Sequence, residues 1–224
     1  MRNIILQHYD GKLGELEKFS VDNIKRYAER CGAEYELVLG KPLGSKLCPQ
    51  SQKLCMLLEK YDDYDMVVML DIDMFERKGQ TANIFTDATG IGMYSSIQQE
   101  LHKGLVKTFP MLCGMDAPYW GGAVYRMNLE ERKRLRKVMD VNELAVFNRS
   151  HVDEGCMNRL SFLSGQKFST LSGPDGGAEW CHCSFKEGIE NAALIHIRPK
   201  FKLTGPRVPK IDVYQNLVSR GLVE

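Results

Sequence analysis

The sequence has no long hydrophobic run. Its first apolar stretch, residues 4–6, ends at Gln7 and His8 and is too short for the core of a signal peptide. No later stretch approaches the roughly 20 consecutive apolar residues that a membrane-spanning helix requires. These absences predict a soluble chain with a cytoplasmic location.

An excess of charge of either sign is also lacking. The 224 residues include 30 Lys and Arg against 29 Asp and Glu, which gives a formal net charge of +1. This balance argues against nucleic acid or an anionic membrane surface as a partner. Any phosphate group would therefore be bound by a few local residues. The length suits one α/β domain, either alone or as a module of a longer protein.

A disulfide framework is absent as well. The seven cysteines are an odd number without regular spacing, which favours a reducing compartment. Cys181, His182 and Cys183 could suggest zinc, but no second Cys-x-x-Cys or His pair completes a tetrahedral set. The pattern argues against a structural zinc ion.

Two phosphate-binding motifs are missing. No Gly-x-Gly-x-x-Gly follows the first predicted strand, and no Gly-x-x-x-x-Gly-Lys-Ser/Thr occurs anywhere. A dinucleotide fingerprint and a P-loop are thus both excluded, which leaves a metal ion as the natural means of neutralising phosphate.

Asp71 and Asp73 follow an uninterrupted apolar stretch, Met66–Leu70. Its length and charged flanks are typical of a strand that is covered on both faces. Ligands of open α/β sheets bind outside the carboxyl ends of such strands. Two carboxylates at this spacing suit Mg²⁺ or Mn²⁺ that is also held by a diphosphate. An exposed strand end or a helix cap would explain the same two residues equally well.

The first third of the chain has a regular pattern. Strands are expected at 3–8, 34–39 and 66–70, and helices at 13–30 and 51–60, from the period of the apolar residues and the turn signals between them. This βαβαβ order predicts the mononucleotide-binding half of a doubly wound sheet.

The rest of the chain is less regular. Residues 98–115 are expected to form a loop-rich stretch that could cover a site. The other predicted elements are a short helix at 81–86, a strand at 91–94, a helix from Asn128 through Val138, a helix opened by Val152, strands at 167–171, 180–185 and 192–197, and a closing helix at 211–222.

Two segments of this second part contain candidate site residues. Gly121 and Gly122 come just before a predicted strand, where glycine lets the backbone approach a ligand closely, although a β-bulge explains them equally well. Asp153 and Glu154 open a predicted helix. An acidic residue there is usually a cap, but a role in the site stays open.

These features occur in an order that resembles the GT-A fold glycosyltransferases, particularly the retaining enzymes of the glycogenin and lipopolysaccharide galactosyltransferase type. The order is a strand ending in Asp-x-Asp, a glycine pair before a later strand, Asp-Glu opening a helix, and a His near the C-terminus followed by Lys. The residues that strengthen the resemblance are Ser20, Asn23, Tyr27 and Ala28, and the Ser51-Gln-Lys-Leu54 segment.

The resemblance spans most of the chain and implies a single GT-A domain. Its fold class would be α/β, a Rossmann-like mixed sheet with helices on both faces, divided into a nucleotide-binding half (1–75) and a metal and acceptor half (76–224). The chain is also similar to the glycosyltransferase domains with which chloroviruses glycosylate their capsids. Membership of that group would explain the absence of a Golgi-type membrane anchor, would place the chain in the host cytoplasm, and would allow further domains in a longer chain.

The resemblance implies a metal site for Mn²⁺ or Mg²⁺. Asp73 and His196 would hold the metal together with the donor diphosphate, and Asp71 would bind the metal or the ribose and sugar of the donor. His182 is a competing candidate for a metal or acceptor ligand. A single histidine is more often a structural residue than a ligand, and this applies to both histidines.

The resemblance also implies a site for a UDP-sugar donor. Residues at the end of the first strand would contact the nucleobase, Lys53 would lie near the ribose or phosphate, and the segment before the later strand would border donor sugar and acceptor. Asp153 would hold sugar hydroxyls, and Lys200 would contact the leaving diphosphate. The donor-binding residues are thus Gln7, His8, Tyr9, Lys53, Asp71, Trp120, Gly121, Gly122 and Lys200.

One departure affects the phosphate contact. The family commonly has Gly-x-x-Lys-Pro-Trp after its metal histidine, whereas this chain has Ile197-Arg-Pro-Lys-Phe201. The assignment therefore stays open between Lys200 and Arg198.

The expected reaction is sugar transfer from a UDP-sugar to a glycan or a protein-linked acceptor. The family implies retention. Inversion would require a carboxylate base, for which Asp153 or Glu154 could serve. The donor sugar cannot be assigned, because a few hydrogen bonds to hydroxyl groups set that choice.

Two alternatives are a phosphatase of the haloacid dehalogenase type and a catalytically silent module that binds a nucleotide-sugar. The phosphatases also have an apolar strand ending in Asp-x-Asp, but their nucleophile follows the first strand, and Thr or Val commonly follows the pair. Here the strand is the third, and Met74 follows the pair.

Overall fold

The structure is a computed structural model that describes residues 1–94, 106–108, 110, 120–146, 152–167, 169–171, 180–183, 188–198 and 208–224, without the side chains of 94, 120, 152, 182 and 183. A five-stranded sheet lies at the centre of this described part, with the strand order β2-β1-β3-β6-β5. Its strands are β1 (Asn3–Tyr9), β2 (Glu34–Leu39), β3 (Met66–Leu70), β5 (Gly92–Tyr94) and β6 (Trp120–Asn128).

The sheet is mixed, and its direction changes beside β3. Strand β1 pairs in parallel with both β2 and β3, whereas β6 runs antiparallel to β3 and to β5. The described residues also form a smaller sheet. In it, β8 (Leu194–His196) lies antiparallel to β4 (Met74–Glu76) and parallel to β7 (Cys181–Cys183). The α/β mixed sheet is the predicted fold class.

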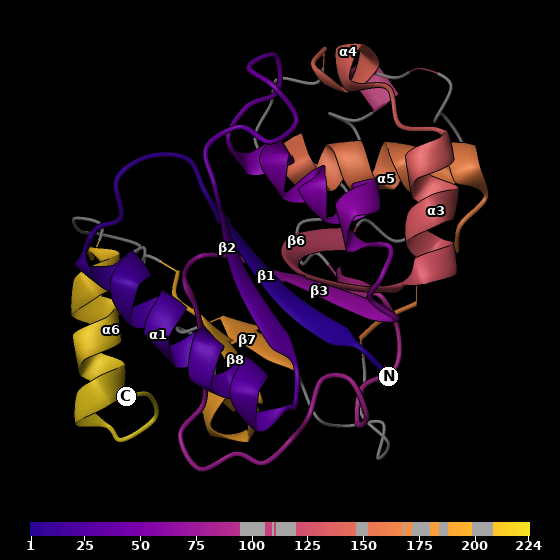
Figure 1. Ribbon diagram of the computed structural model, residues 1–224. Coiled ribbons are helices and arrows are strands. Elements are labelled where there is room, and N and C mark those ends of the chain that lie inside the picture. Colours follow the sequence, from indigo (N-terminus) through magenta and orange to yellow (C-terminus); the bar gives the residue numbers. More distant parts are fainter. Residues whose placement is uncertain are drawn as a thin grey trace.

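Helices cover both faces of the central sheet (Figure 1). The α-helices are α1 (Glu15–Arg30), α3 (Leu129–Lys137), α4 (Val141–Leu144), α5 (Val152–Ser164) and α6 (Lys210–Ser219), and the 3₁₀-helices are η1 (Gln50–Leu57), η2 (Glu59–Tyr61) and η4 (Ile189–Asn191). Helices α1 and α6 lie side by side on one side of the sheet, with η1, α3 and α5 on the other. No helix in the described ranges is long and apolar enough to cross a membrane.

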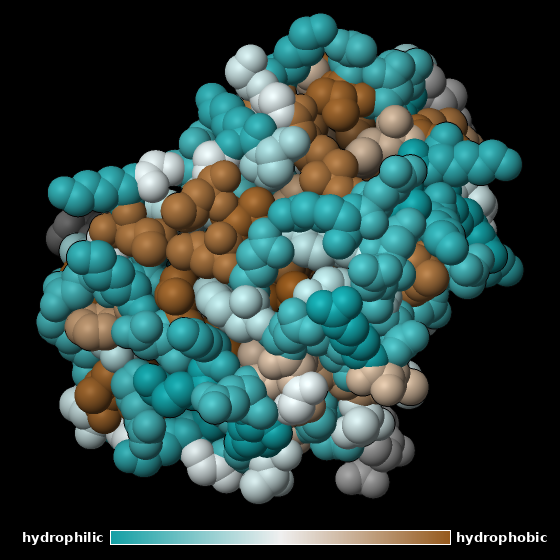
Figure 2. Space-filling view, in the orientation of Figure 1, coloured by the Kyte–Doolittle hydropathy of each residue, from teal (hydrophilic) through white to brown (hydrophobic). Residues whose placement is uncertain are grey.

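The uninterrupted apolar run of β3 is explained by this layering. Successive side chains of a strand point to opposite faces, so Val67 and Met69 pack in the core beneath η1 and α5, while Val68 and Leu70 pack beneath α1. All four are fully buried. The surface in the view of Figure 2 is mostly hydrophilic, with apolar side chains gathered between the α1–α6 layer and the α3–α5 layer.

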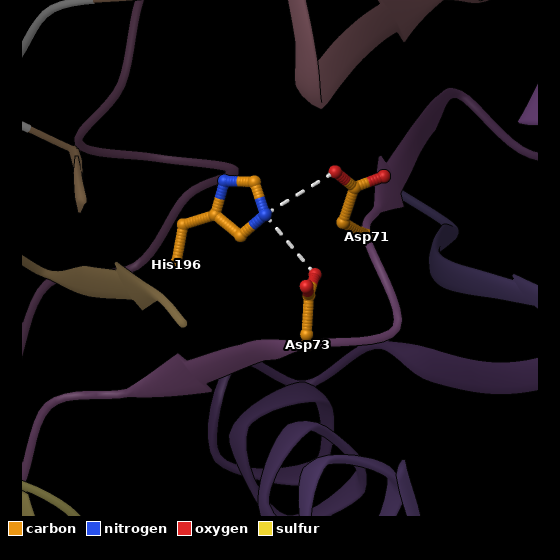
Figure 3. A group of neighbouring side chains, drawn as sticks. All are labelled: Asp71, Asp73 and His196. Carbon is orange, nitrogen blue, oxygen red and sulfur yellow. Dashed lines mark ion pairs between the residues drawn. The ribbon is translucent and has the colours of Figure 1, made fainter. Parts of the chain in front are cut away.

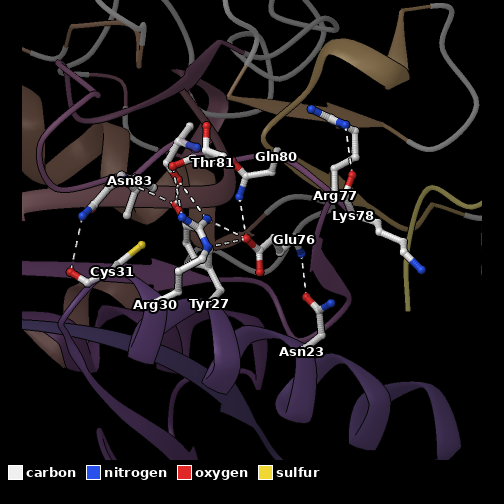
Figure 4. A network of polar contacts seen from close by, with 12 residues as sticks. Asn23, Tyr27, Arg30, Cys31, Glu76, Arg77, Lys78, Gln80, Thr81 and Asn83 are labelled. Atoms are coloured by element: carbon white, nitrogen blue, oxygen red, sulfur yellow. Dashed lines mark hydrogen bonds and ion pairs between the residues drawn. The ribbon is translucent and has the colours of Figure 1, made fainter.

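A polar network fastens the chain after β4 to α1 (Figure 4). Arg30 of α1 donates from Nη2 to Glu76 Oε1 at 2.6 Å, and Asn23 Oδ1 accepts from the Glu76 backbone N–H at 2.6 Å. Arg30 also donates to the carbonyl oxygens of Thr81 and Ala82. Strand β4 is thereby held on α1 directly after the Asp71–Asp73 segment.

Two predicted elements are wrong, and one has a different geometry. Residues 84–87 form a turn rather than part of a helix, because the Asn83 and Asp87 side chains accept hydrogen bonds from backbone N–H groups of the same segment. In the described part of 167–171 no strand forms, and Thr170 makes only an isolated bridge to Gly92. The predicted helix at 51–60 is two 3₁₀-helices, separated by the extended residue Leu58.

Candidate functional site

Asp71 and Asp73 lie in the turn that joins β3 to β4, which we call the acidic loop (71–73). His196 belongs to β8, where it is the register partner of Met74, and Ile197 N–H donates to the Asp73 carbonyl at 2.9 Å. The pairing of β4 with β8 therefore places the imidazole beside the two carboxylates, as Figure 3 shows.

The three side chains form a compact cluster. His196 Nε2 lies 3.1 Å from Asp73 Oδ1 and 3.5 Å from Asp71 Oδ2. Asp73 and His196 are buried, and Asp71 is partly exposed. Burial raises the pKa of Asp73, but the neighbouring His196 and Lys210 outweigh it and hold this pKa below its usual value. Asp73 is therefore ionised at neutral pH.

The donor set of this cluster fits a divalent cation. Each of the three residues offers one ligand atom, and these atoms lie within 4.8 Å of one another. Two carboxylate oxygens and one imidazole nitrogen suit Mn²⁺, and these three ligands from the described residues leave positions for phosphate oxygens. The cluster consists of the three residues predicted as metal ligands.

Lys53 joins the acidic loop to the start of α5. Its ammonium lies 2.5 Å from Asp71 Oδ1 and 2.5 Å from Asp153 Oδ2, and it donates to the Gly122 carbonyl at 2.8 Å. Burial lowers the pKa of this lysine, but the two carboxylates outweigh burial and raise the pKa above its ordinary value. Lys53 is thus a permanent cation that holds three segments together.

Gly122 lies where β6 passes closest to these groups. A Cβ atom on this residue would be 2.2 Å from Asp153 Oδ2 and 3.1 Å from Lys53 Nζ. The register between β5 and β6 is also irregular here, with Gly92 opposite Tyr125 and the next residue, Met93, opposite Gly121. The irregularity in the sheet agrees with the predicted β-bulge. The backbone also passes close to Asp153 and Lys53, whereas its approach to a ligand stays a prediction.

Glu154 is the most unusual carboxyl group of the site. It is 8% exposed, its Oε1 accepts a hydrogen bond from Gly122 N–H at 3.0 Å, and its Oε2 is buried without a hydrogen-bond partner among the described residues. Burial and the adjacent Asp153 raise its pKa to about 8. The group is therefore mostly protonated at neutral pH.

Gln7 supports the acidic loop from below. Its side chain is fully buried and donates from Nε2 to the Asp71 carbonyl at 2.9 Å and to Ser20 Oγ at 3.0 Å. Its Oε1 accepts from Tyr35 OH at 2.9 Å, and Ser20 Oγ in turn donates to the Met74 carbonyl at 2.7 Å. These contacts use the amide of Gln7 to position the loop, so a contact with a nucleobase would fall to its backbone.

The next two residues of β1 lie at the end of the sheet. His8 is buried, and its Nε2 is 2.7 Å from the Gly40 carbonyl; burial lowers its pKa. Tyr9 is half-buried, and its carbonyl accepts from Gly40 N–H. Their predicted contact with the base stays a prediction.

Three predicted residues fall wholly or partly outside the described part of the chain. These are Lys200 and the side chains of Trp120 and His182. Arg198, the alternative to Lys200, is described and is half-buried. The choice between the two for phosphate contact stays a prediction.

Lys210 is a member of the site that the sequence did not indicate. It is the first residue of α6, and its ammonium forms an ion pair with Asp73 Oδ2. Nothing in the neighbouring sequence indicates this contact, because it depends on how α6 packs against the rest of the molecule.

No protein-family model matches the chain, and no curated protein sequence is significantly similar to it. The fold, in contrast, is shared with solved structures, and it is the GT-A fold of glycosyltransferases. It gives no support to the phosphatase alternative.

Three solved structures illustrate the likeness. The crystal structure of a glycosyltransferase involved in glycosylation of the major capsid of PBCV-1 superposes with a TM-score of 0.61 at 9% identity, over 97% of this chain and 100% of the other. Mouse xyloside xylosyltransferase 1 gives a TM-score of 0.51 at 10% identity, over 93% and 100%. The bifunctional glycosyltransferase WbbM gives 0.51 at 11% identity, over 96% of this chain but 49% of WbbM.

Proposed function

We propose that this chain is a metal-dependent glycosyltransferase that transfers a sugar from a UDP-sugar to a glycan or protein-linked acceptor. The observation that carries the proposal is the cluster of Asp71, Asp73 and His196 at the carboxyl end of β3, in a GT-A fold. Within it, residues 1–224 would act as one domain, with 1–75 as the nucleotide-binding half and 76–224 as the metal and acceptor half.

In this proposal Asp71, Asp73 and His196 would hold Mn²⁺ or Mg²⁺ together with the donor diphosphate. When bound, the cation would act as a Lewis acid for the charge that develops on the departing phosphate. Lys53 is a permanent ammonium group between Asp71 and Asp153, and we assign it the task of orienting these two carboxylates. Asp153 would then present its oxygens to hydroxyl groups of the donor sugar.

The remaining predicted residues would line the donor. Gln7, His8 and Tyr9 would border the base through β1, and Trp120, Gly121 and Gly122 would border the sugar and the acceptor. Lys200 or Arg198 would contact the diphosphate.

The state of the two carboxyl groups at the start of α5 favours retention. Inversion needs a carboxylate that can take a proton from the acceptor hydroxyl. Asp153 is engaged by Lys53, and the pKa of Glu154 is raised to about 8 by burial, so that this group is mostly protonated at neutral pH. Neither is a free base, which supports the retaining assignment.

The proposed acceptor is supported by likeness of fold alone. The PBCV-1 glycosyltransferase, whose fold this chain shares, is involved in glycosylation of a major capsid. We propose viral capsid glycosylation in the host cytoplasm as the role of this chain, and transfer assays with glycan and glycoprotein acceptors test it.

Calorimetric titration with UDP, with and without Mn²⁺, tests the proposal as a whole. We expect the native chain to bind UDP only with Mn²⁺, and Asp73→Asn to lose this binding because a metal ligand is removed. Asp63→Asn is the matched control, since the Asp63 side chain is 87% exposed and remote from the cluster. Absence of UDP binding under every metal condition would refute the UDP assignment. Metal-dependent binding without transfer to any acceptor or water would favour the silent nucleotide-sugar module.

A further inference from the structure

Lys210 reaches the acidic loop because of the way α6 packs. Tyr214, one helical turn further on, stacks on Phe19 of α1 with ring centroids 5.2 Å apart and lies against Phe75 of β4 at 4.9 Å. Residues four apart share one face of an α-helix. Docking of Tyr214 therefore turns Lys210 toward Asp73, which lies two residues before Phe75 in the chain. Lys210 and Asp73 form an ion pair.

Lys53 and Lys210 both pair with the acidic loop, but they are held very differently. The Lys53 side chain is 10% exposed and contacts Asp71, Asp153 and the Gly122 carbonyl. The Lys210 side chain is 38% exposed, and within the described part of the chain Asp73 is its only ion-pair partner. Lys53 is thus a fixed part of the site, whereas Lys210 can leave Asp73 by rotating a flexible and partly solvated side chain.

A divalent cation at the cluster would compete with Lys210. Asp73 directs Oδ1 to His196 and Oδ2 to Lys210. A cation held by Asp73 would therefore lie close to the ammonium group, and the repulsion between the two is strong in a partly buried site, where the effective dielectric constant is low. Binding of the cation alone must displace Lys210 at a cost.

We propose that Lys210 is a resident counter-ion of Asp73 that gives way to the divalent cation and then pairs with the diphosphate of the donor. This inference rests on the proposed function, because it requires a diphosphate at the cation. The start of α6 supports it, since its N-cap residue, Pro209, provides no side-chain cap for the first N–H groups. Such N–H groups favour an anion. Lys210 would thereby couple the binding of the cation to the binding of the diphosphate. The cation displaces Lys210 from Asp73, and the diphosphate provides a new anionic partner for the displaced lysine.

Calorimetry on Lys210→Met tests the exchange. This substitution keeps most of the side-chain volume and removes the charge. We expect Mn²⁺ alone to bind about two- to fivefold more tightly, the range for loss of a partly exposed competing ion pair. With saturating Mn²⁺, we expect UDP and inorganic pyrophosphate to bind about ten- to a hundredfold more weakly, because a charge-assisted contact is lost.

Two further variants complete the design. Lys210→Arg keeps the charge and should retain native-like coupling between Mn²⁺ and pyrophosphate. Lys78→Met removes an exposed lysine that pairs with Glu224, and it should change neither affinity. A far-UV circular dichroism spectrum and a thermal midpoint establish that each variant is folded.

The outcomes separate this inference from the proposed function. Unchanged Mn²⁺ affinity in Lys210→Met overturns the role as counter-ion, and unchanged pyrophosphate affinity overturns the transfer to the diphosphate. If the native chain binds Mn²⁺ and pyrophosphate but not UDP, the UDP assignment fails while the exchange at Lys210 is still tested. If it binds UDP with Mn²⁺ and Lys210→Met behaves like the native chain, only the exchange fails.

Discussion

At the scale of single residues, the site is organised by charges that are paired with one another. Asp71 and Asp153 share the ammonium of Lys53, and Asp73 contacts Lys210. Among the described residues no cation forms an ion pair with Glu154, and burial together with Asp153 keeps this group mostly protonated. A buried carboxyl group in the neutral form avoids the cost of an unpaired buried charge.

Glu154→Gln should remove a pH dependence of stability. The pKa of Glu154 is raised from 4.5 to about 8 by burial and the nearby Asp153, so between these values the folded chain keeps a proton that the unfolded chain releases. Native stability contributed by this group is therefore full below about pH 4.5 and is lost as the pH rises toward 8. Gln cannot ionise, so the variant does not lose this stability as the pH rises. Between pH 4.5 and pH 8, the free energy of unfolding of the variant should therefore rise by about 3–5 kcal/mol relative to that of the native chain.

Urea denaturation at both pH values measures this difference. Glu130→Gln is the control, because the Glu130 side chain is 78% exposed. A difference between Glu154→Gln and the native chain that stays constant with pH would contradict the assignment.

Gly122→Ala should impair the site through a steric clash. The new Cβ would be 2.2 Å from Asp153 Oδ2, so Asp153 or β6 must move and the contact with Lys53 is lost. We expect UDP-sugar turnover to fall about 100-fold, as for a displacement of about 1 Å in catalytic geometry. Gly14→Ala is the control, since its Cβ would meet only the carboxylate end of Glu17, which can rotate away. Native-like turnover in Gly122→Ala would disprove the requirement for glycine.

At the scale of elements, the acidic loop is positioned from beneath by β1 and α1. Gln7 of β1 holds the Asp71 carbonyl and Ser20 of α1 holds the Met74 carbonyl, so both ends of the loop are hydrogen-bonded to buried side chains. Asn23, one turn after Ser20, accepts from Glu76 N–H in β4. The first strand and helix therefore act as a rigid support for the candidate metal ligands.

Ser20→Ala should weaken this support. It leaves the Met74 carbonyl without its hydroxyl donor and removes one acceptor of Gln7 Nε2, in a fully buried position. We expect the free energy of unfolding to fall by about 1–3 kcal/mol, and metal-dependent UDP affinity to fall with it. Urea denaturation measures the first effect and calorimetry the second. Ser219→Ala, at an exposed helix end, should cost less than about 0.5 kcal/mol, and an equally small cost for Ser20→Ala would argue against the support.

At the scale of the whole molecule, the site is assembled from segments far apart in the sequence. The acidic loop, Lys53 of η1, Gly122 of β6, Asp153 of α5 and His196 of β8 meet at the carboxyl end of β3, beside the point where the sheet changes from parallel to antiparallel. Because these residues come from segments throughout the chain, a ligand bound there should stabilise the entire fold.

UDP with Mn²⁺ should therefore raise the thermal midpoint. At a concentration 100 times its dissociation constant, a ligand adds about 2.7 kcal/mol to the free energy of unfolding, which corresponds to about 5–10 °C for a chain of this length. Differential scanning fluorimetry measures the shift. It should be absent in Asp73→Asn and should vanish when EDTA removes the metal. A shift of equal size with UDP and EDTA would show that the metal is dispensable.

Local pattern was enough to predict much of this molecule. The alternation and length of apolar runs located β2 and β3 at their observed bounds and β1 and α1 to within two residues. The Asn128 and Glu131 pair indicated the capping box that begins α3. The acidic loop followed from the rule that sites lie beyond the carboxyl ends of strands. These features depend on neighbouring residues in the sequence, so the sequence alone is sufficient for them.

Packing between distant segments was needed for the rest. The pairing of His196 with the acidic loop arises from the register of β4 and β8, and the contact of Lys210 with Asp73 arises from the docking of Tyr214 on α1 and β4. The ionisation of Glu154 depends on burial beneath β6. Periodicity and spacing indicate which face of an element is apolar. The contacts named above depend instead on which elements lie against one another, and the packing of the whole core decides that arrangement.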